Sequence, residues 1–184
     1  MADTDWREQL PAKVRTLQIV IGALSFGCLP LLVIAIFVSQ NANNAVDQPM
    51  LTYIALAMAG MILGVWTFLP GVIVSQGRKE IQRKLLSPTE KASDKSADDK
   101  VEKEKSKAQG LFGLFQTKTI IAGALLEGAV FLLLIAYLVE HNIFSILAAV
   151  AMLLLLTAHI PTIGRVTNWI ENQMRLVDEE RAFG

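Results

Sequence analysis

The chain has 184 residues, of which 53% are hydrophobic, and its 17 basic residues balance its 17 acidic residues. The basic residues are interleaved with acids and lack neighbouring aromatics for base stacking, which argues against a nucleic-acid-binding protein. The hydrophobic residues gather into four long runs, residues 16–40, 48–77, 119–139 and 142–164. A soluble bundle would show a polar stripe along each helix, and these runs show none. Composition therefore argues against a soluble protein.

Each of the four runs is long enough to cross a membrane, because a hydrocarbon core of ~30 Å needs about 20 helical residues. The sequence predicts five segments in chain order. These are a cytoplasmic N-terminal segment (1–15), a first transmembrane hairpin whose second helix extends into the cytoplasm (16–86), a flexible charged linker (87–110), a second transmembrane hairpin (111–164) and an amphipathic cytoplasmic tail (165–184). The linker is assigned as flexible because its Lys, Asp, Glu, Ser and Ala residues offer little apolar surface.

The basic residues define the expected orientation. All Lys and Arg lie before residue 16, between residues 78 and 118, or after residue 164, and four crossings put these regions on one side. Short basic flanks stay in the cytoplasm. We therefore expect a multi-pass protein of the cytoplasmic (inner) membrane with both termini inside.

The chain contains the same membrane segment twice. Residues 16–38 align with residues 117–139 at a constant offset of 101, with 11 of 23 positions identical. The runs that follow align more weakly, with Pro70 against Pro161. The expected fold class is thus an all-α integral membrane protein with four transmembrane helices. These form two tandem hairpins, a parallel internal repeat related by a pseudo-two-fold axis along the membrane normal.

The two copies differ in their ionisable groups. Glu127 stands opposite Phe26, and His159 stands opposite Phe68. Glu127 falls near the membrane midplane, and His159 and Thr157 enter the same leaflet from the antiparallel helix, where their side chains could reach it. One interpretation is a polar latch, an interhelical hydrogen bond that fixes the helix register. The other is a proton- or ion-binding site, since ionisable groups inside the membrane are costly and often functional.

Small residues recur at four-residue spacing, which favours close helix packing in lipid. They occur in the first, second and third helices, and the positions are Ala23, Gly27, Gly60, Gly64, Ala124 and Gly128. They are expected to hold the four-helix bundle together. In an alternative interpretation, the second-helix pair Gly60 and Gly64 faces outward and makes a contact between copies of the chain.

The run from Gly123 to Gly128 (Gly-Ala-Leu-Leu-Glu-Gly) resembles the rotary-ATPase proteolipid subunits, over about a third of the chain. Those are Gly/Ala-rich helical hairpins with one mid-membrane carboxylate, so the resemblance implies a proton- or cation-handling role for Glu127. This chain departs from that pattern in three ways. Its acid lies in the first helix of the hairpin, its charged linker has no counterpart, and its first and third helices lack a dense glycine ladder.

The sequence therefore supports two functional hypotheses. The first is an accessory, scaffold or assembly component of the membrane, with the bilayer, a homo-oligomer or a membrane protein as its partner. The second is a proton- or cation-handling subunit that uses Glu127. We expect no enzymatic activity, because no metalloprotease, paired-aspartate or serine-nucleophile pattern occurs in the membrane segments. No cofactor, metal or nucleic-acid partner is predicted.

Overall fold

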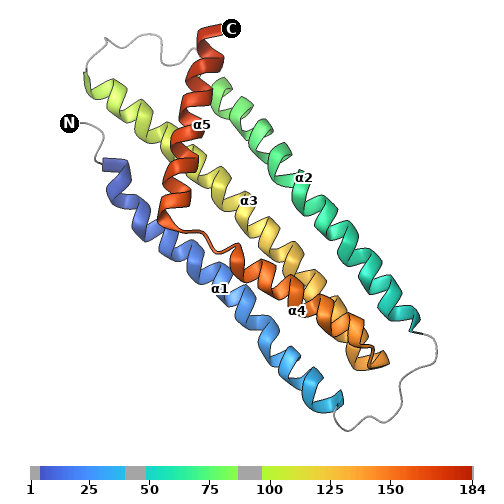
Figure 1. Ribbon diagram of the computed structural model, residues 1–184. Helices are drawn as coiled ribbons and strands as arrows, with labels where there is room; N and C mark the ends of the chain where they lie inside the picture. The colour runs from blue at the N-terminus through green and yellow to red at the C-terminus, as the bar shows by residue number, and fades with distance from the viewer. Residues whose placement is uncertain (1–4, 40–48, 87–96, 184) are drawn as a thin grey trace. The chain divides into compact units, whose positions relative to one another are not determined.

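The computed structural model describes residues 5–39, 49–86 and 97–183, and these residues form helices joined by short connections (Figure 1). The five helices are α1 (Asp5–Ser39), α2 (Met50–Leu86), α3 (Ala97–Glu140), α4 (Ile143–Ala158) and α5 (Ile163–Phe183). The described residues contain no strand. The prediction of an all-α protein is confirmed.

Three of the helices are long and apolar enough to cross a membrane. The candidate spans are Leu10–Val38 in α1, Met50–Glu80 in α2 and Lys105–Glu140 in α3. With 16 residues, α4 is about 24 Å long, shorter than a bilayer core. A fourth span exists only if α4 and α5 are counted together across the break between them. The structure thus supports a helical membrane protein with three or four spans.

The break after α4 is at the proline expected to interrupt the helix. Pro161 carries no N–H to continue the helical pattern, and the carbonyl of Thr157 instead accepts a hydrogen bond from Ile160 N–H at 3.2 Å. The aligned proline of the first copy, Pro70, lies inside the continuous helix α2. The two positions that align in sequence therefore differ in structure.

The chain divides into two compact units that separate its charges. Residues 1–17, 71–118 and 161–184 form one unit, and residues 18–70 and 119–160 form the other. All 17 Lys and Arg belong to the first, which we call the charged unit. The second, the apolar unit, has only Asp47, Glu127 and Glu140 as acidic residues.

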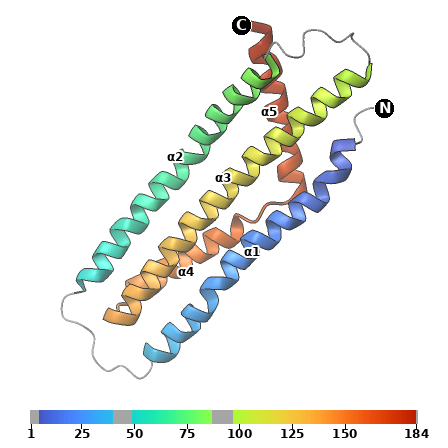
Figure 2. The same cartoon turned by 180° about the vertical axis from the view of Figure 1, so that it is seen from behind.

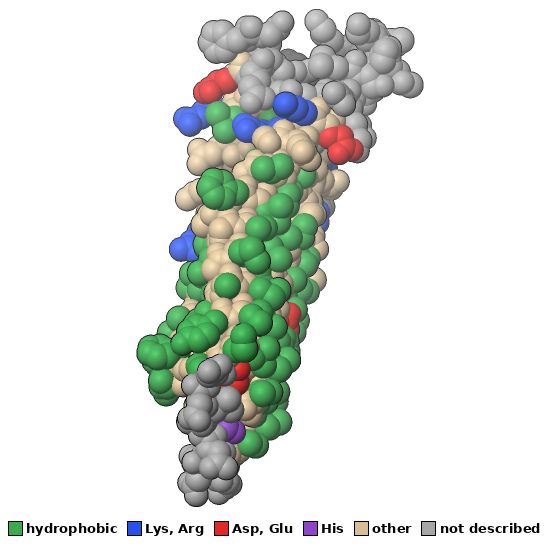
Figure 3. Space-filling model, turned by 90° about the vertical axis from the view of Figure 1, so that its right-hand side faces the viewer, with side chains coloured by type: hydrophobic (Ala, Val, Ile, Leu, Met, Phe, Trp, Pro, Cys, Tyr) green, Lys and Arg blue, Asp and Glu red, His purple; other side chains and the backbone are tan. Residues whose placement is uncertain are grey.

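The apolar unit is organised around α3, which lies between α1 and α2 in both ribbon views (Figures 1 and 2). Half of the α3 span is buried, compared with 6% of the α2 span. The buried α3 residues, among them Leu126, Leu133 and Leu134, form one core cluster with residues of α1, α2 and α4. Many large apolar side chains on α1, α2 and α4 are exposed, and they cover much of the face in Figure 3. Such a surface suits lipid better than water.

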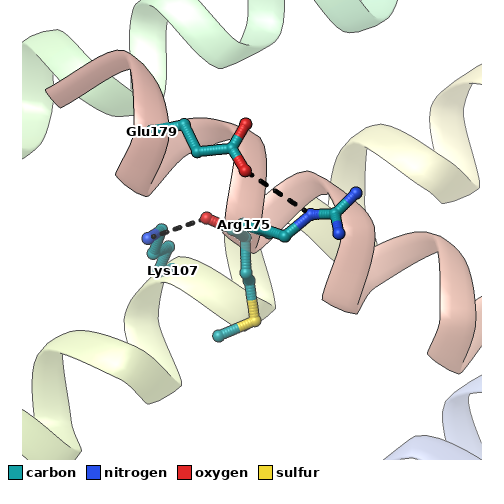
Figure 4. Close-up of polar contacts among 4 residues, drawn as sticks. Lys107, Arg175 and Glu179 are labelled. Carbon is teal, nitrogen blue, oxygen red and sulfur yellow. Dashed lines mark hydrogen bonds and ion pairs between the residues drawn. The ribbon is translucent and has the colours of Figure 1, made fainter. Parts of the chain in front are cut away.

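The charged unit contains the N-terminal parts of α1 and α3, the C-terminal part of α2, and α5. The apolar face of α5 is fully buried at Val166, Ile170 and Val177, as is Leu111 of α3. Lys107 of α3 donates to the backbone carbonyl of Met174 in α5 at 3.5 Å (Figure 4). The i, i+4 pair Arg175 and Glu179 lies beside this contact and is exposed. Apolar packing and a charged hydrogen bond thus join α3 to α5.

The start of α3 differs from the expected flexible linker. The helix begins at Ala97, so residues 97–110 are helical, while residues 87–96 of the linker lie outside the described residues. Part of the reason is packing, because Ala108 and Lys107 are buried in the charged unit. The abundant Ala, Glu and Lys also have high helix propensity.

Candidate functional site

Glu127, the acid that distinguishes the second repeat copy, lies in the apolar unit where α3 meets α1. One of its carboxyl oxygens lies 3.4 Å from the position a Cβ atom on Gly27 would occupy. The thiol of Cys28, the next residue of α1, is buried and within electrostatic range of the carboxyl. Glu127 itself is half-buried. A methyl group at position 27 would therefore be in ordinary van der Waals contact with the carboxyl group.

The two residues expected to pair with Glu127 contact other groups. The hydroxyl of Thr157 donates to the carbonyl of Leu154 in its own helix at 2.8 Å, and Thr157 is exposed. The His159 ring lies edge-on to Trp66 of α2, with ring centroids 5.4 Å apart. His159 also ends α4, because its N–H bonds to the carbonyls of Leu155 and Leu156 at 3.1 Å. The observed contacts of these three residues are therefore with different neighbours.

The small residues selected from the sequence lie mostly on exposed surface. Gly60 and Gly64 are exposed, and a Cβ atom added to either would have nothing within 4 Å. Ala23, Ala124 and Gly128 are exposed as well. Gly27 is exposed too, and a Cβ atom there would lie 3.4 Å from a carboxyl oxygen of Glu127.

A different set of small residues is buried where the helices of the apolar unit pack together. They are buried members of the core cluster on α1, α2, α3 and α4: Ala35, Ala55, Ala59, Ala129, Ala136 and Ala149. Small residues thus do bring helices together in this unit, as the sequence suggested, but mostly at positions other than those selected.

The strongest polar contact in the apolar unit is one that the sequence did not reveal. Glu140, at the end of α3, is 6% exposed, and its two carboxyl oxygens accept hydrogen bonds from two backbone N–H groups at the start of α2. The donors are Leu51 at 2.6 Å and Thr52 at 2.7 Å. The first N–H groups of a helix have no partner within it and carry partial positive charge. Glu140 therefore caps α2 from another helix.

Two buried hydroxyl groups extend this contact to α4. Ser145 donates to the Thr52 hydroxyl at 2.9 Å, and both residues are fully buried. The turn between α3 and α4 holds them in place. Its His141 adopts a left-handed backbone with φ 53°, and the side chain of Asn142 caps α4 by accepting from Phe144 N–H at 3.0 Å. Glu140, Thr52 and Ser145, which we call the cap cluster, thus join three helices.

One sequence feature signals that α2 needs such a cap. Pro49 precedes the helix and has no side-chain acceptor, and the first turn of α2 contains no acidic residue. A helix start without a local cap needs an acceptor from elsewhere. Glu140 supplies that acceptor from the end of α3, where it is buried.

The two acidic sites of the apolar unit suit different chemistry. The cap cluster is satisfied internally and acts as a structural connection. Glu127 is a half-buried carboxyl group in apolar surroundings, which is suited to holding a proton or a cation. The described residues contain no group of three His, Cys, Asp or Glu side chains that could hold a metal ion.

Comparison with protein-family models, curated proteins and solved structures finds no match.

Proposed function

We propose that the protein is an accessory or scaffold component of the cytoplasmic membrane. In this proposal the apolar unit is the membrane anchor, with four crossings arranged as two tandem hairpins, and the charged unit binds a membrane-protein partner from the cytoplasm. The observation that carries the proposal is the separation of charge. Every Lys and Arg lies in one compact helical unit with its own buried residues, and the other unit exposes apolar surface.

Proton or cation handling at Glu127 is the second candidate. It is supported by the position of this half-buried carboxyl group beside Gly27 of α1, in a unit that otherwise has very few charges. Buried or half-buried acids inside membranes commonly mark ion and proton paths.

The topology in this proposal can be tested with single cysteines in a Cys28→Ala background. Ser106→Cys tests an exposed position of the charged unit, and Asn43→Cys tests the expected outer loop. In intact cells, an impermeant maleimide should label Asn43→Cys only. Ser106→Cys should react after the membrane is permeabilised. Labelling of both positions from the same side would contradict the two-hairpin topology.

The scaffold and conduction hypotheses make opposite predictions for Glu127→Gln. A photo-crosslinking residue at Ser106 should give a discrete adduct with another membrane protein in intact membranes, and Glu127→Gln should leave that adduct unchanged. A crosslinker at Ile54, an exposed apolar position on α2, should give no such adduct.

Flux measurements complete this test. Purified protein in vesicles should pass neither protons nor monovalent cations under an imposed gradient, with or without the substitution. Wild-type flux that disappears in Glu127→Gln would establish the conducting role in place of the scaffold role.

A further inference from the structure

The ammonium group of Lys118 lies between two aromatic rings in the charged unit. Its Nζ atom is 5.0 Å from the ring centroid of Phe115, one turn earlier in α3, and 4.8 Å from that of Trp169 in α5. The two rings also contact each other, with centroids 5.2 Å apart. Ring faces attract a cation but do not neutralise it. Lys118 is thus held beside two rings that both attract a cation.

A second lysine of the charged unit lies over a single aromatic ring. Lys13 of α1 lies over the ring of Phe112, with its Nζ atom 5.7 Å from the centroid. Phe112 and Phe115 are three residues apart on α3, so they neighbour each other on one helix face. Among the described residues, no carboxylate forms an ion pair with Lys13 or Lys118. By contrast, Lys107 further along α3 donates to the Met174 carbonyl.

The position of both lysines along the chain places them at the membrane surface. Lys118 immediately precedes the apolar run of residues 119–139, and Lys13 lies three residues before the uncharged run of residues 16–40. A run of 21 residues is about 32 Å long, which matches the hydrocarbon core. If these two runs fill the hydrocarbon core, both ammonium groups would lie near the depth of the lipid phosphates, where Trp169 also suits the headgroup region.

We propose that Lys13 and Lys118 bind the phosphate groups of anionic phospholipids. The aromatic ring or rings beside each ammonium group hold that lysine in place to meet a phosphate. A bound phosphate would supply the negative charge that these lysines lack within the described structure. Lipid binding at these lysines needs no protein partner. A negative result for it would therefore not contradict the scaffold proposal.

Trp169 can report on this site directly. In a Trp6→Phe, Trp66→Phe background, Trp169 is the remaining tryptophan. The protein is placed in phosphatidylcholine nanodiscs that contain a small share of either brominated phosphatidylglycerol or brominated phosphatidylcholine. Bromine quenches tryptophan at close range. We expect stronger quenching by the brominated anionic lipid, with an apparent affinity that falls about fivefold when Lys118, which contacts Trp169, is changed to glutamine.

Three controls make the result decisive. Lys79→Gln removes an exposed charge from α2 and should leave the preference intact, and Lys118→Arg should retain it. Unchanged helical circular dichroism in Lys13→Gln and Lys118→Gln would show that the fold persists. Equal quenching by both lipids in the starting protein, or an undiminished preference in the Lys13→Gln, Lys118→Gln double variant, would overturn the proposal. So would loss of the preference on adding inorganic phosphate, because the site would then take a soluble anion.

Discussion

Replacing Glu140 by alanine should destabilise the protein more than the loss of a single neutral hydrogen bond, because two charge-assisted hydrogen bonds are lost. The N–H groups of Leu51 and Thr52 would lose their acceptor at the start of α2, whose first turn contains no acidic residue. The loss can be measured as the change in unfolding free energy in mixed detergent micelles, followed by circular dichroism.

A second acid offers a matched control for this measurement. Glu179 is 54% exposed and pairs with Arg175 on the surface of α5. Since exposed i, i+4 pairs contribute about 0.3–0.5 kcal/mol, Glu179→Ala should have little effect. Ser145→Ala, which removes one hydroxyl of the cap cluster, should cost about 1 kcal/mol. A cost for Glu140→Ala no greater than that for Glu179→Ala would show that α2 does not depend on this cap.

Replacing Gly77 by alanine should destabilise the charged unit by at most about 2 kcal/mol, because overpacking costs about 1–3 kcal/mol and the better helix propensity of alanine offsets about 0.5–1 kcal/mol of it. Gly77 of α2 is buried, and a Cβ atom there would overlap the Leu114 side chain of α3, with Cδ1 at 2.6 Å and Cγ at 2.9 Å. Leu114 is half-buried, so a change of its rotamer relieves part of the clash. Thermal unfolding in detergent would measure the effect.

Two further variants identify the cause. Gly113→Ala places a methyl group on the exposed side of α3, where nothing lies within 4 Å, and should stabilise the helix by about 0.5–1 kcal/mol. In a Leu114→Ala background, Gly77→Ala should lose most of its cost, which a double-mutant cycle would detect. An equal cost in both backgrounds would contradict the proposed clash.

The sequence reveals the helical membrane class because this depends on local composition. Apolar runs without charge predict spans regardless of how the helices pack. The division into an apolar and a charged unit follows the same pattern, since all Lys and Arg lie outside the four runs. Pro161 follows the end of α4, whereas Pro70, which lacks the same donor, lies inside the continuous helix α2.

The polar contacts are much harder to predict because they depend on which helix faces meet. Glu127 was expected to face α4, but its carboxyl group lies beside Gly27 of α1. Glu140 bonds to residues 88 and 89 positions earlier in the chain, and no periodicity within α3 indicates this partner. Small-residue spacing identifies surfaces that allow close approach but does not say whether a helix of the same chain is there.

The central position of α3 has a consequence for the order in which the protein assembles during synthesis. The first two helices leave the ribosome before α3 exists, yet α3 provides seven of the 14 buried residues in the core cluster of the apolar unit. The N–H groups at the start of α2 acquire their acceptor only when Glu140 has been made, 89 residues after Leu51. A nascent chain that ends before Glu140 should therefore hold α1 and α2 without their final packing. Completion of α3 is the step that commits the membrane part to its native fold.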